Sequence, residues 1–394
     1  MCCGFKDMHW RSKLIHPGAH APANFRSLAT PTYRGSTVVF ERQADVSDDW
    51  RQTENGYSYG LYGTPTVLEL GARIAEIEGA HHSFVVPGGQ AAIALIYLAY
   101  CRSGTHALVP FTAYGPNREL AGGLLQRLGI SVEAYDPLLG AEIATLIRED
   151  TALIWTESPG SVTMEVQDVP AIVAAAHARN VPVALDNTYA AGVLFDAFAH
   201  GVDVSMQALT KYVGGHSDLL LGTVSVAGAA AYEAVGPVYK QLGMAVSPDD
   251  CSLALRGLQT LGVRLERLEK TALEVARWLA KHPNIKAVLH PALRSCPGHE
   301  HWQRDFTGSS SVFSIVFDER FTPAQVIAFA DRLTLFKIGF SWGGVTSLVI
   351  VYPKLDRAAE DYGGRLVRLN VGLEESSDLI ADLHQALSTM DTPA

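Results

Sequence analysis

The sequence predicts an α/β protein in which a mainly parallel sheet is covered by helices on both faces and a smaller α+β domain follows. Short apolar runs alternate with helical patterns through much of the chain, which is typical of parallel strands joined by crossover helices. The 394 residues exceed what one core usually holds. After Pro248 the pattern changes to a long amphipathic segment and short strands. We therefore expect an N-terminal arm over residues 1–58, a large domain over 59–248 and a C-terminal domain over 249–394.

Composition and charge limit the classes of partner. The chain is 48% hydrophobic and 18% charged, as expected of a folded protein. Its net charge is −10 and it has no basic block, so nothing favours nucleic-acid binding. The most apolar helix expected, 91–101, is too short to span a bilayer, and the first residues lack the apolar core of a signal peptide. We expect a soluble cytoplasmic protein with no nucleic-acid or membrane partner.

Cysteine and histidine patterns predict neither disulfides nor a metal site. The five cysteines are scattered and odd in number, which favours reduced thiols: Cys2, Cys3, Cys101, Cys251 and Cys296. Two groups of histidines are not expected to bind zinc, since neither stands beside a Cys-x-x-Cys pair: His16 with His20, and His290, His299 and His301 around Cys296.

The elements follow from hydrophobic periodicity, taken in chain order. The arm has little helical periodicity and should gain order by lying on another surface. Large-domain strands are expected at 82–86, 107–110, 130–135, 152–155, 181–185 and 202–209. Helices are expected at 67–78, with Thr66 as N-cap, at 91–101 and at 169–179. The C-terminal part should hold a helix at 251–281, strands at 285–290, 312–316, 348–351 and 366–371, and two further helices.

An acid and a lysine stand at the ends of two of these strands. Asp186 closes the strand 181–185, and Lys211 follows the strand 202–209. Ligands of open α/β sheets bind outside the carboxyl ends of the strands. A lysine in apolar surroundings loses its proton more easily and can form a Schiff base with a carbonyl. Such a pair suits pyridoxal phosphate (PLP), although an acid after a strand is common and the pair alone establishes no cofactor.

Longer motifs carry a resemblance to a known family. The segments DNTYAAG (186–192) and QALTKYVGGHSD (207–218) closely resemble the active-site region of the Cys/Met-metabolism PLP enzymes, and the resemblance runs from about Leu14 to about Leu387. That family includes cystathionine β-lyases, γ-synthases, γ-lyases and sulfhydrylases. It implies a fold-type I PLP-dependent transferase fold with a seven-stranded sheet, PLP as cofactor, a small amino-acid substrate and a homo-oligomer built as a dimer of dimers. The arm is then expected to contact a neighbouring subunit.

The resemblance also implies roles for single residues. Lys211 would hold the cofactor and act as the base, Asp186 would pair with the ring nitrogen, and Tyr114 would stack on the ring near the leaving group. The backbone amides of Gly89 and Gln90, the hydroxyl of Thr210, and Tyr59 from a neighbouring subunit would bind the phosphate. Arg368 would grip the substrate α-carboxylate, and Ser341 and Trp342 belong to the loop that faces the rest of the substrate.

Three positions depart from the family pattern at the phosphate. Leu61 stands where an arginine is expected, Ala208 where a serine is frequent, and Gly88 where a serine precedes the glycine turn. A leucine cannot pair with a phosphate, so one charge-assisted contact is lost or comes from elsewhere, with Arg34 and Arg118 as candidates.

The resemblance therefore implies trans-sulfuration chemistry, most closely β-elimination of cystathionine to homocysteine, pyruvate and ammonia in methionine biosynthesis. Trp342 favours a β-lyase, because γ-acting members usually carry leucine in this loop. A γ-acting enzyme (γ-synthase or γ-lyase) and a cysteine desulfhydrase remain the alternatives. A non-catalytic regulator on the same fold is disfavoured by the intact set of Lys211, Asp186, Tyr114 and Arg368.

Overall fold

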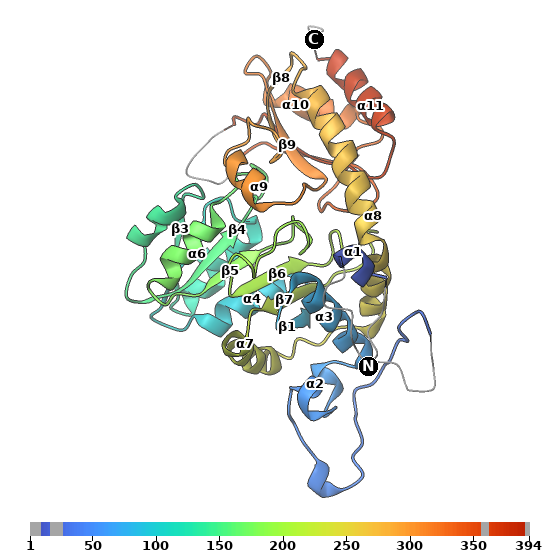
Figure 1. The fold of residues 1–394 in the computed structure, drawn as a ribbon. Coiled ribbons are helices and arrows are strands. Elements are labelled where there is room, and N and C mark those ends of the chain that lie inside the picture. Colours follow the sequence, from blue (N-terminus) through green and yellow to red (C-terminus); the bar gives the residue numbers. More distant parts are fainter. Residues whose placement is uncertain (1–8, 16–26, 356–361, 391–394) are drawn as a thin grey trace.

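The computed structural model describes residues 9–15, 27–355 and 362–390, and these form two lobes, each built around its own sheet (Figure 1). Cys2, Cys3, His16 and His20 lie outside the described residues. Within those three stretches no helix is long and apolar enough to cross a membrane. The three described cysteines, Cys101, Cys251 and Cys296, are buried free thiols.

The large lobe contains a seven-stranded sheet in the order β1-β7-β6-β5-β4-β2-β3, which confirms the predicted fold class. Four of its neighbouring pairs are parallel, whereas β7 runs antiparallel to both β1 and β6. The strands are β1 (His82–Val86), β2 (His106–Pro110), β3 (Ser131–Tyr135), β4 (Thr151–Glu157), β5 (Val183–Asp186), β6 (Val204–Ala208) and β7 (Gly222–Val226). Only β7 has no counterpart among the six strands expected from the sequence. Its five residues are all buried, although their β-branched alternation is a strand signal.

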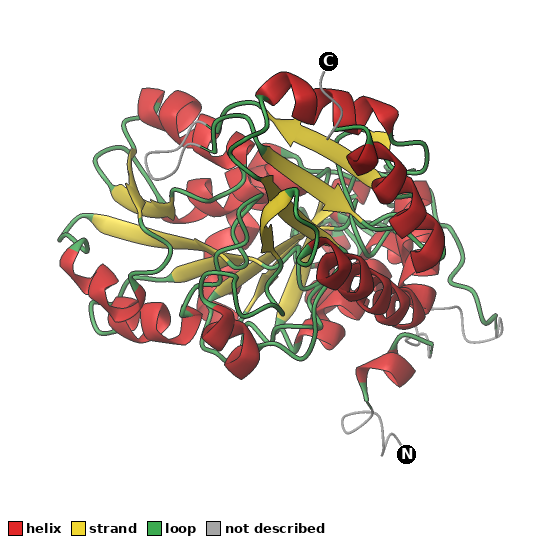
Figure 2. Ribbon diagram, turned by 90° about the horizontal axis from the view of Figure 1, so that it is seen from above, coloured by secondary structure: helices red, strands yellow, loops and turns green. Residues whose placement is uncertain are grey.

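Helices cover both faces of this sheet (Figure 2). One face packs on α4 and α7, the other on α6 and, near β1, on α3 and α8. Trp155 on β4 points to the first face and its neighbour Ile154 to the second, as strand alternation requires. The helices of this lobe are α3 (Pro65–Glu78), α4 (Gly89–Tyr100), α5 (Gly115–Leu120), α6 (Val169–His177) and α7 (Ala229–Leu242).

The start of α3 corrects one expectation. Thr64, not Thr66, is the N-cap, because Pro65 takes the first helical turn, where its fixed φ suits the helix and its missing N–H is not needed. Thr66 is fully buried inside the helix, and its hydroxyl forms hydrogen bonds with the arm instead of capping the helix. It donates to the carbonyl of Pro31 (2.9 Å) and accepts from the amide of Tyr33 (2.8 Å).

The arm contains only short helical pieces among its described residues: α1 (Trp10–Lys13), α2 (Gln52–Asn55) and a 3₁₀ turn (Gln43–Asp45). A second 3₁₀ turn, Gly60–Tyr62, follows the arm. Trp50 anchors it by packing on Phe84 and Tyr232, with ring centroids 5.8 and 4.8 Å away. Gly236 makes this possible, since a Cβ there would lie 1.9 Å from the Trp50 ring.

The second lobe has a five-stranded sheet in the order β10-β11-β12-β9-β8. Its strands are β8 (Ile285–Leu289), β9 (Val312–Phe317), β10 (Lys337–Ile338), β11 (Leu348–Tyr352) and β12 (Leu366–Asn370). Its helices are α9 (His299–Asp305), α10 (Pro323–Arg332) and α11 (Ser376–Ser388). The sequence predicted two helices here, and the structure has three. The 32-residue α8 (Pro248–Leu279) runs along both lobes, with Leu258 in the core beside α3 and Val275 in the core of the second lobe.

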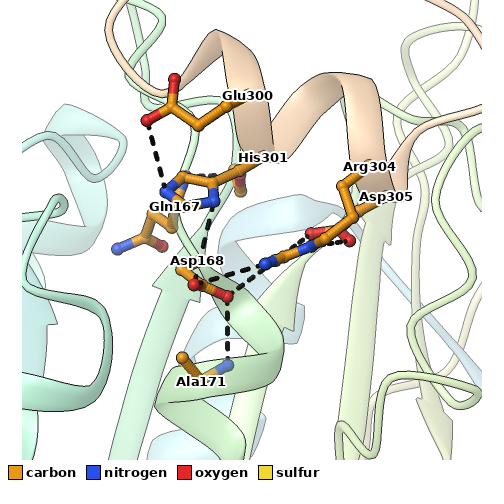
Figure 3. Close-up of polar contacts among 8 residues, drawn as sticks. Gln167, Asp168, Ala171, Glu300, His301, Arg304 and Asp305 are labelled. Atoms are coloured by element: carbon orange, nitrogen blue, oxygen red, sulfur yellow. Dashed lines mark hydrogen bonds and ion pairs between the residues drawn. The ribbon is translucent and has the colours of Figure 1, made fainter.

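An ion cluster joins the lobes between α6 and α9 (Figure 3). Asp168 caps α6 by accepting from the amide of Ala171 (3.2 Å), and it also accepts from Arg304 Nη2 (2.7 Å). The His301 Nδ1 lies 3.8 Å from the same carboxylate. His301 thus belongs to an interlobe contact. Among the described residues no group of three or more His, Cys, Asp and Glu side chains could hold a metal ion.

Candidate active site

A cavity of 310 Å³ opens at the carboxyl ends of β4, β5 and β6. It brings together most of the site residues expected from the sequence, namely Gly89, Gln90, Tyr114, Asp186, Thr210, Lys211, Trp342 and Arg368. The first six come from the large lobe and the last two from the second. Both lobes are therefore needed to build the cavity.

Lys211 reaches the cavity from the turn that follows β6. Its Nζ donates to the hydroxyl of Ser341 (2.7 Å) and lies 5.4 Å from the centre of the Trp342 ring. Burial lowers the pKa of Lys211 to about 8, and the positive charge of Arg368 adds to this effect while the carboxylate of Asp186 opposes it. The amine therefore exists partly in its neutral, nucleophilic form near neutral pH.

Ser341 connects the lysine to the arginine. Its backbone φ of 76° is in the left-handed region, where a residue with a side chain is strained. In this conformation the hydroxyl accepts from Lys211, while the carbonyl accepts from Arg368 Nη2 (3.1 Å). Arg368 itself lies on the central strand β12, is 9% exposed and lies 6.0 Å from the ring of Tyr352. A guanidinium held there can bind a carboxylate with two parallel hydrogen bonds.

Asp186 ends β5 on the cavity wall. Its Oδ1 accepts from the amide of Thr188 (3.0 Å), and the Thr188 hydroxyl accepts from the amide of Ala208 on β6. Burial raises the pKa of the Asp186 carboxyl, and hydrogen bonds from Thr188 together with the positive charge of Lys211 act in the opposite direction. A buried carboxylate of this kind matches a cationic ring N–H.

A glycine cradle also lines the cavity. Gly88 and Gly89 begin α4, whose first amides and helix dipole suit an anion. A Cβ on Gly89 would lie 2.9 Å from Ala208 Cβ, and one on Gly222 would lie 2.6 Å from the Gly88 carbonyl oxygen. The absence of side chains at these positions is therefore a packing requirement. The donor set and the cradle fit PLP: amides for its phosphate, Asp186 for its ring nitrogen and Lys211 for its aldehyde.

Of the expected phosphate ligands, Thr210 has another contact within this chain and Tyr59 lies outside the cavity. The Thr210 hydroxyl donates to the carbonyl of Leu221 (3.3 Å). Tyr59 is 45% exposed and does not line the cavity, and neither does Leu61. Arg34, a candidate substitute cation, forms a fork with the carboxylate of Asp249.

Sequence reasoning missed several cavity residues, among them Glu157, Ser161, Thr188 and Tyr189. Glu157 ends β4 next to Asp186 in the strand register, so the rule that led to Asp186 applies to it equally. Its Oε2 accepts from the amide of Tyr114 (2.7 Å).

The turn that carries Lys211 is held from outside the large lobe's sheet. Arg264 on α8 is buried and donates to the carbonyls of Tyr212 (2.6 Å) and Gly257 (2.8 Å). The Tyr212 hydroxyl is 3.0 Å from that of Ser311, at the edge of the second lobe's β9. No sequence pattern marks Arg264, because its contacts with the lysine turn are to main-chain carbonyls.

The cavity combines a lysine of lowered pKa, a buried carboxylate and a helix N-terminus, which together define an active site built for an aldehyde cofactor with an anionic tail. The chain belongs to the Cys/Met metabolism PLP-dependent enzyme family, whose sequence signature matches residues 11–388. It is 40% identical over 386 residues to the cystathionine β-lyase of Escherichia coli, covering 96% of this chain and 98% of that one. It is 37% identical over 380 residues to an L-alanine/L-glutamate racemase of Wolbachia pipientis, covering 92% and 93%.

Solved structures agree with this assignment. A cystathionine γ-lyase from Lactobacillus plantarum, crystallised with L-serine, superposes with a TM-score of 0.89 at 26% identity, covering 98% of this chain and 100% of that one. The family resemblance drawn from the sequence and its PLP cofactor are confirmed.

Proposed function

We propose that this protein is a PLP-dependent carbon–sulfur lyase that converts cystathionine to homocysteine, pyruvate and ammonia. The observation that carries the proposal is the convergence of Lys211, Asp186 and Arg368 on one cavity. Relatives named cystathionine β-lyase, such as that of Escherichia coli at 40% identity, support the β-elimination over γ-chemistry. So does Trp342, whose ring lies beside the lysine amine.

PLP would be held by Lys211, by Asp186 at its ring nitrogen and by the amides of Gly89 and Gln90 at its phosphate. When bound, it supplies an electron sink that stabilises negative charge at the substrate Cα. Thr210 and, from a neighbouring subunit, Tyr59 are proposed further phosphate ligands.

The residues of the chain then have separate tasks. Arg368 binds the α-carboxylate and thereby fixes which bond at Cα faces the lysine. The neutral amine of Lys211 takes the Cα proton, and Ser341 keeps that amine aimed into the cavity. Tyr114 lies at the wall where the sulfur leaves, and Trp342 limits the room for the distal part of the substrate. Release of the thiol and hydrolysis of the three-carbon remainder give pyruvate and ammonia.

We further propose that the enzyme works in the cytoplasm as a dimer of dimers. Reduced, buried cysteines support the first part. The second part is supported by exposed Tyr59 and by an arm that lies on the outside of the fold. Purified protein should sediment as a dimer or tetramer, and an active monomer would contradict the proposal.

Product analysis tests the reaction. Purified protein with PLP and cystathionine should give pyruvate and homocysteine, with Lys211→Ala as the inactive control. Formation of 2-oxobutyrate and cysteine would replace the proposal with a γ-lyase. Pyruvate from cysteine but none from cystathionine would replace it with a desulfhydrase.

Racemisation is the second candidate, because a relative with 37% identity is named a racemase and both reactions begin with loss of the Cα proton. Chiral analysis of L-alanine and L-glutamate incubated with the protein decides this. D-Enantiomers formed faster than pyruvate from cystathionine would make racemisation the main activity.

A further inference from the structure

The cavity contains a second carboxylate whose role the proposed reaction leaves open. Four charged side chains line the cavity among the described residues: Glu157, Asp186, Lys211 and Arg368. The proposed chemistry uses the last three. Glu157 and Asp186 are register partners on the parallel strands β4 and β5, so two carboxylates leave the sheet side by side.

The contact made by Glu157 points to Tyr114. Its Oε2 accepts from the backbone amide of Tyr114 at 2.7 Å, a charge-assisted bond to the residue that precedes α5. Tyr114 is 45% exposed and lines the cavity, whereas Glu157 is only 7% exposed. The tyrosine is thus fixed at its backbone while its ring extends into the cavity.

Glu157 is itself rigidly mounted. Its backbone amide donates to Gln167 Oε1 (2.9 Å), and Gln167 Nε2 donates to the hydroxyl of Tyr135 (3.0 Å). That hydroxyl in turn donates to the carbonyl of Trp155 (2.8 Å), two residues before Glu157 on β4. Gln167 precedes the cap of α6, beside the interlobe ion cluster (Figure 3). The chain of bonds returns to the strand where it began, so the backbone at Glu157, from which the carboxylate extends, is fixed.

We propose that Glu157 is a positioning residue for Tyr114: it fixes the place of that tyrosine against the cavity and acts on the reaction through it. The negative charge of Glu157 also affects the pKa of the Tyr114 hydroxyl. Burial raises the pKa of Tyr114, the carboxylates of Asp186 and Glu157 and the phenol of Tyr352 raise it further, and only Arg368 opposes them. The hydroxyl therefore stays protonated at neutral pH and can donate to a ligand. Of the two assays that follow, the kinetic assay rests on the proposed lyase function, whereas the measurement of PLP binding does not.

A double-mutant cycle tests this inference. Glu157→Ala removes the acceptor and should lower kcat/KM about tenfold or more, the size expected for loss of one charge-assisted hydrogen bond. Glu157→Gln retains an acceptor oxygen and should recover most of the loss. In a Tyr114→Ala background, Glu157→Ala should add less than about threefold, because coupled residues are not additive. The PLP dissociation constant from absorbance titration is measured for the same variants and should show the same non-additivity.

Two further variants keep the test decisive. Glu157→Asp retains the charge but withdraws the carboxylate by one methylene, and it replaces Glu157→Ala in the cycle if that variant does not fold. Glu165→Gln is the matched control, since Glu165 lies in the following loop and accepts from Thr163 (2.7 Å), so its effect should add to that of Tyr114→Ala. Additive effects of Glu157 and Tyr114 in both assays would overturn the inference. Wild-type protein that makes no pyruvate would refute the proposed function alone, because the cofactor titration still completes the cycle.

Discussion

Replacing Glu78 with glutamine should remove a pH-dependent loss of stability. Glu78 ends α3 beneath β6 and is 6% exposed. Its Oε1 accepts from Gln207 Nε2 (2.6 Å) and from the Ser205 hydroxyl (3.1 Å). Burial raises the pKa of Glu78 from 4.5 to about 7, although hydrogen bonds from Ser225, Gln207 and Ser205 oppose this.

The sign and size follow from proton linkage. Between the unfolded pKa near 4.5 and the folded pKa of about 7, the folded chain keeps a proton that the unfolded chain has lost. The stability contributed by neutral Glu78 is thus complete below about pH 4.5 and is lost as the pH rises through about 7. That difference is worth about 3 kcal/mol. For 394 residues, with an unfolding entropy of about 0.8 kcal/mol/K, it corresponds to about 4 °C in Tm.

Thermal unfolding of holoenzyme at a fixed PLP concentration measures the effect. The Tm of Glu78→Gln relative to wild type should rise by about 3 °C between about pH 5 and about pH 8, because the amide stays neutral throughout and about a quarter of the full effect is already lost at about pH 5. Glu76→Gln makes the same chemical change on the exposed side of α3 and is the matched control against which the Glu78→Gln difference is compared. A Glu78→Gln difference that is constant across this range would show that the Glu78 carboxyl titrates alike in folded and unfolded chains.

Four other predictions concern the site. Lys211→Ala should abolish both the absorbance of the imine between Lys211 and PLP and turnover, and a variant with full lyase activity would contradict the role of Lys211. Capture of PLP by apoenzyme requires the neutral amine, so its rate should rise with pH up to about 8 and then level off; a rise continuing towards 10.5 would mean that burial does not lower the Lys211 pKa. Arg368→Leu should raise KM steeply while PLP stays bound, with Arg368→Lys a poor rescue; unchanged kinetics would move the carboxylate clamp elsewhere. Leu61→Arg should slow loss of PLP on dialysis, since one charge-assisted hydrogen bond is worth about 1.5–3 kcal/mol; equal retention would mean that another cation already binds the phosphate.

Sequence reasoning reached the fold through its periodic segments and the site through residues next to strand ends. The seven-stranded sheet followed from the family resemblance, whereas periodicity alone missed β7, because this five-residue strand is buried on both faces. The start of α3 was misplaced by two residues, since Thr64 and Thr66 are both plausible caps and only Pro65 between them decides the register.

The support of the site was harder to predict than its reactive groups. Lys211 and Asp186 stand in motifs, but Ser341 binds the lysine because of a backbone conformation that no residue type requires. The position of Glu157 in the cavity depends on β4 and β5 being neighbours in the sheet. Arg264 binds main-chain carbonyls, which every residue has. Such contacts are properties of the folded topology, and single-sequence patterns carry little information about them.

The attachment of the lysine turn to α8 and β9 has a consequence for recombining this protein with its relatives. A crossover near residue 248 separates the lobes at the start of α8. It would exchange Arg368 and Trp342, and with them Arg264 and Ser311, which hold the turn after Lys211. In a chimaera made there to alter substrate choice, the residues that hold the Lys211 turn therefore come from the other protein, while Lys211 itself is native. Retaining the native residues at 264, 311 and 341 in the incoming lobe would preserve the contacts that hold the lysine turn and the lysine amine.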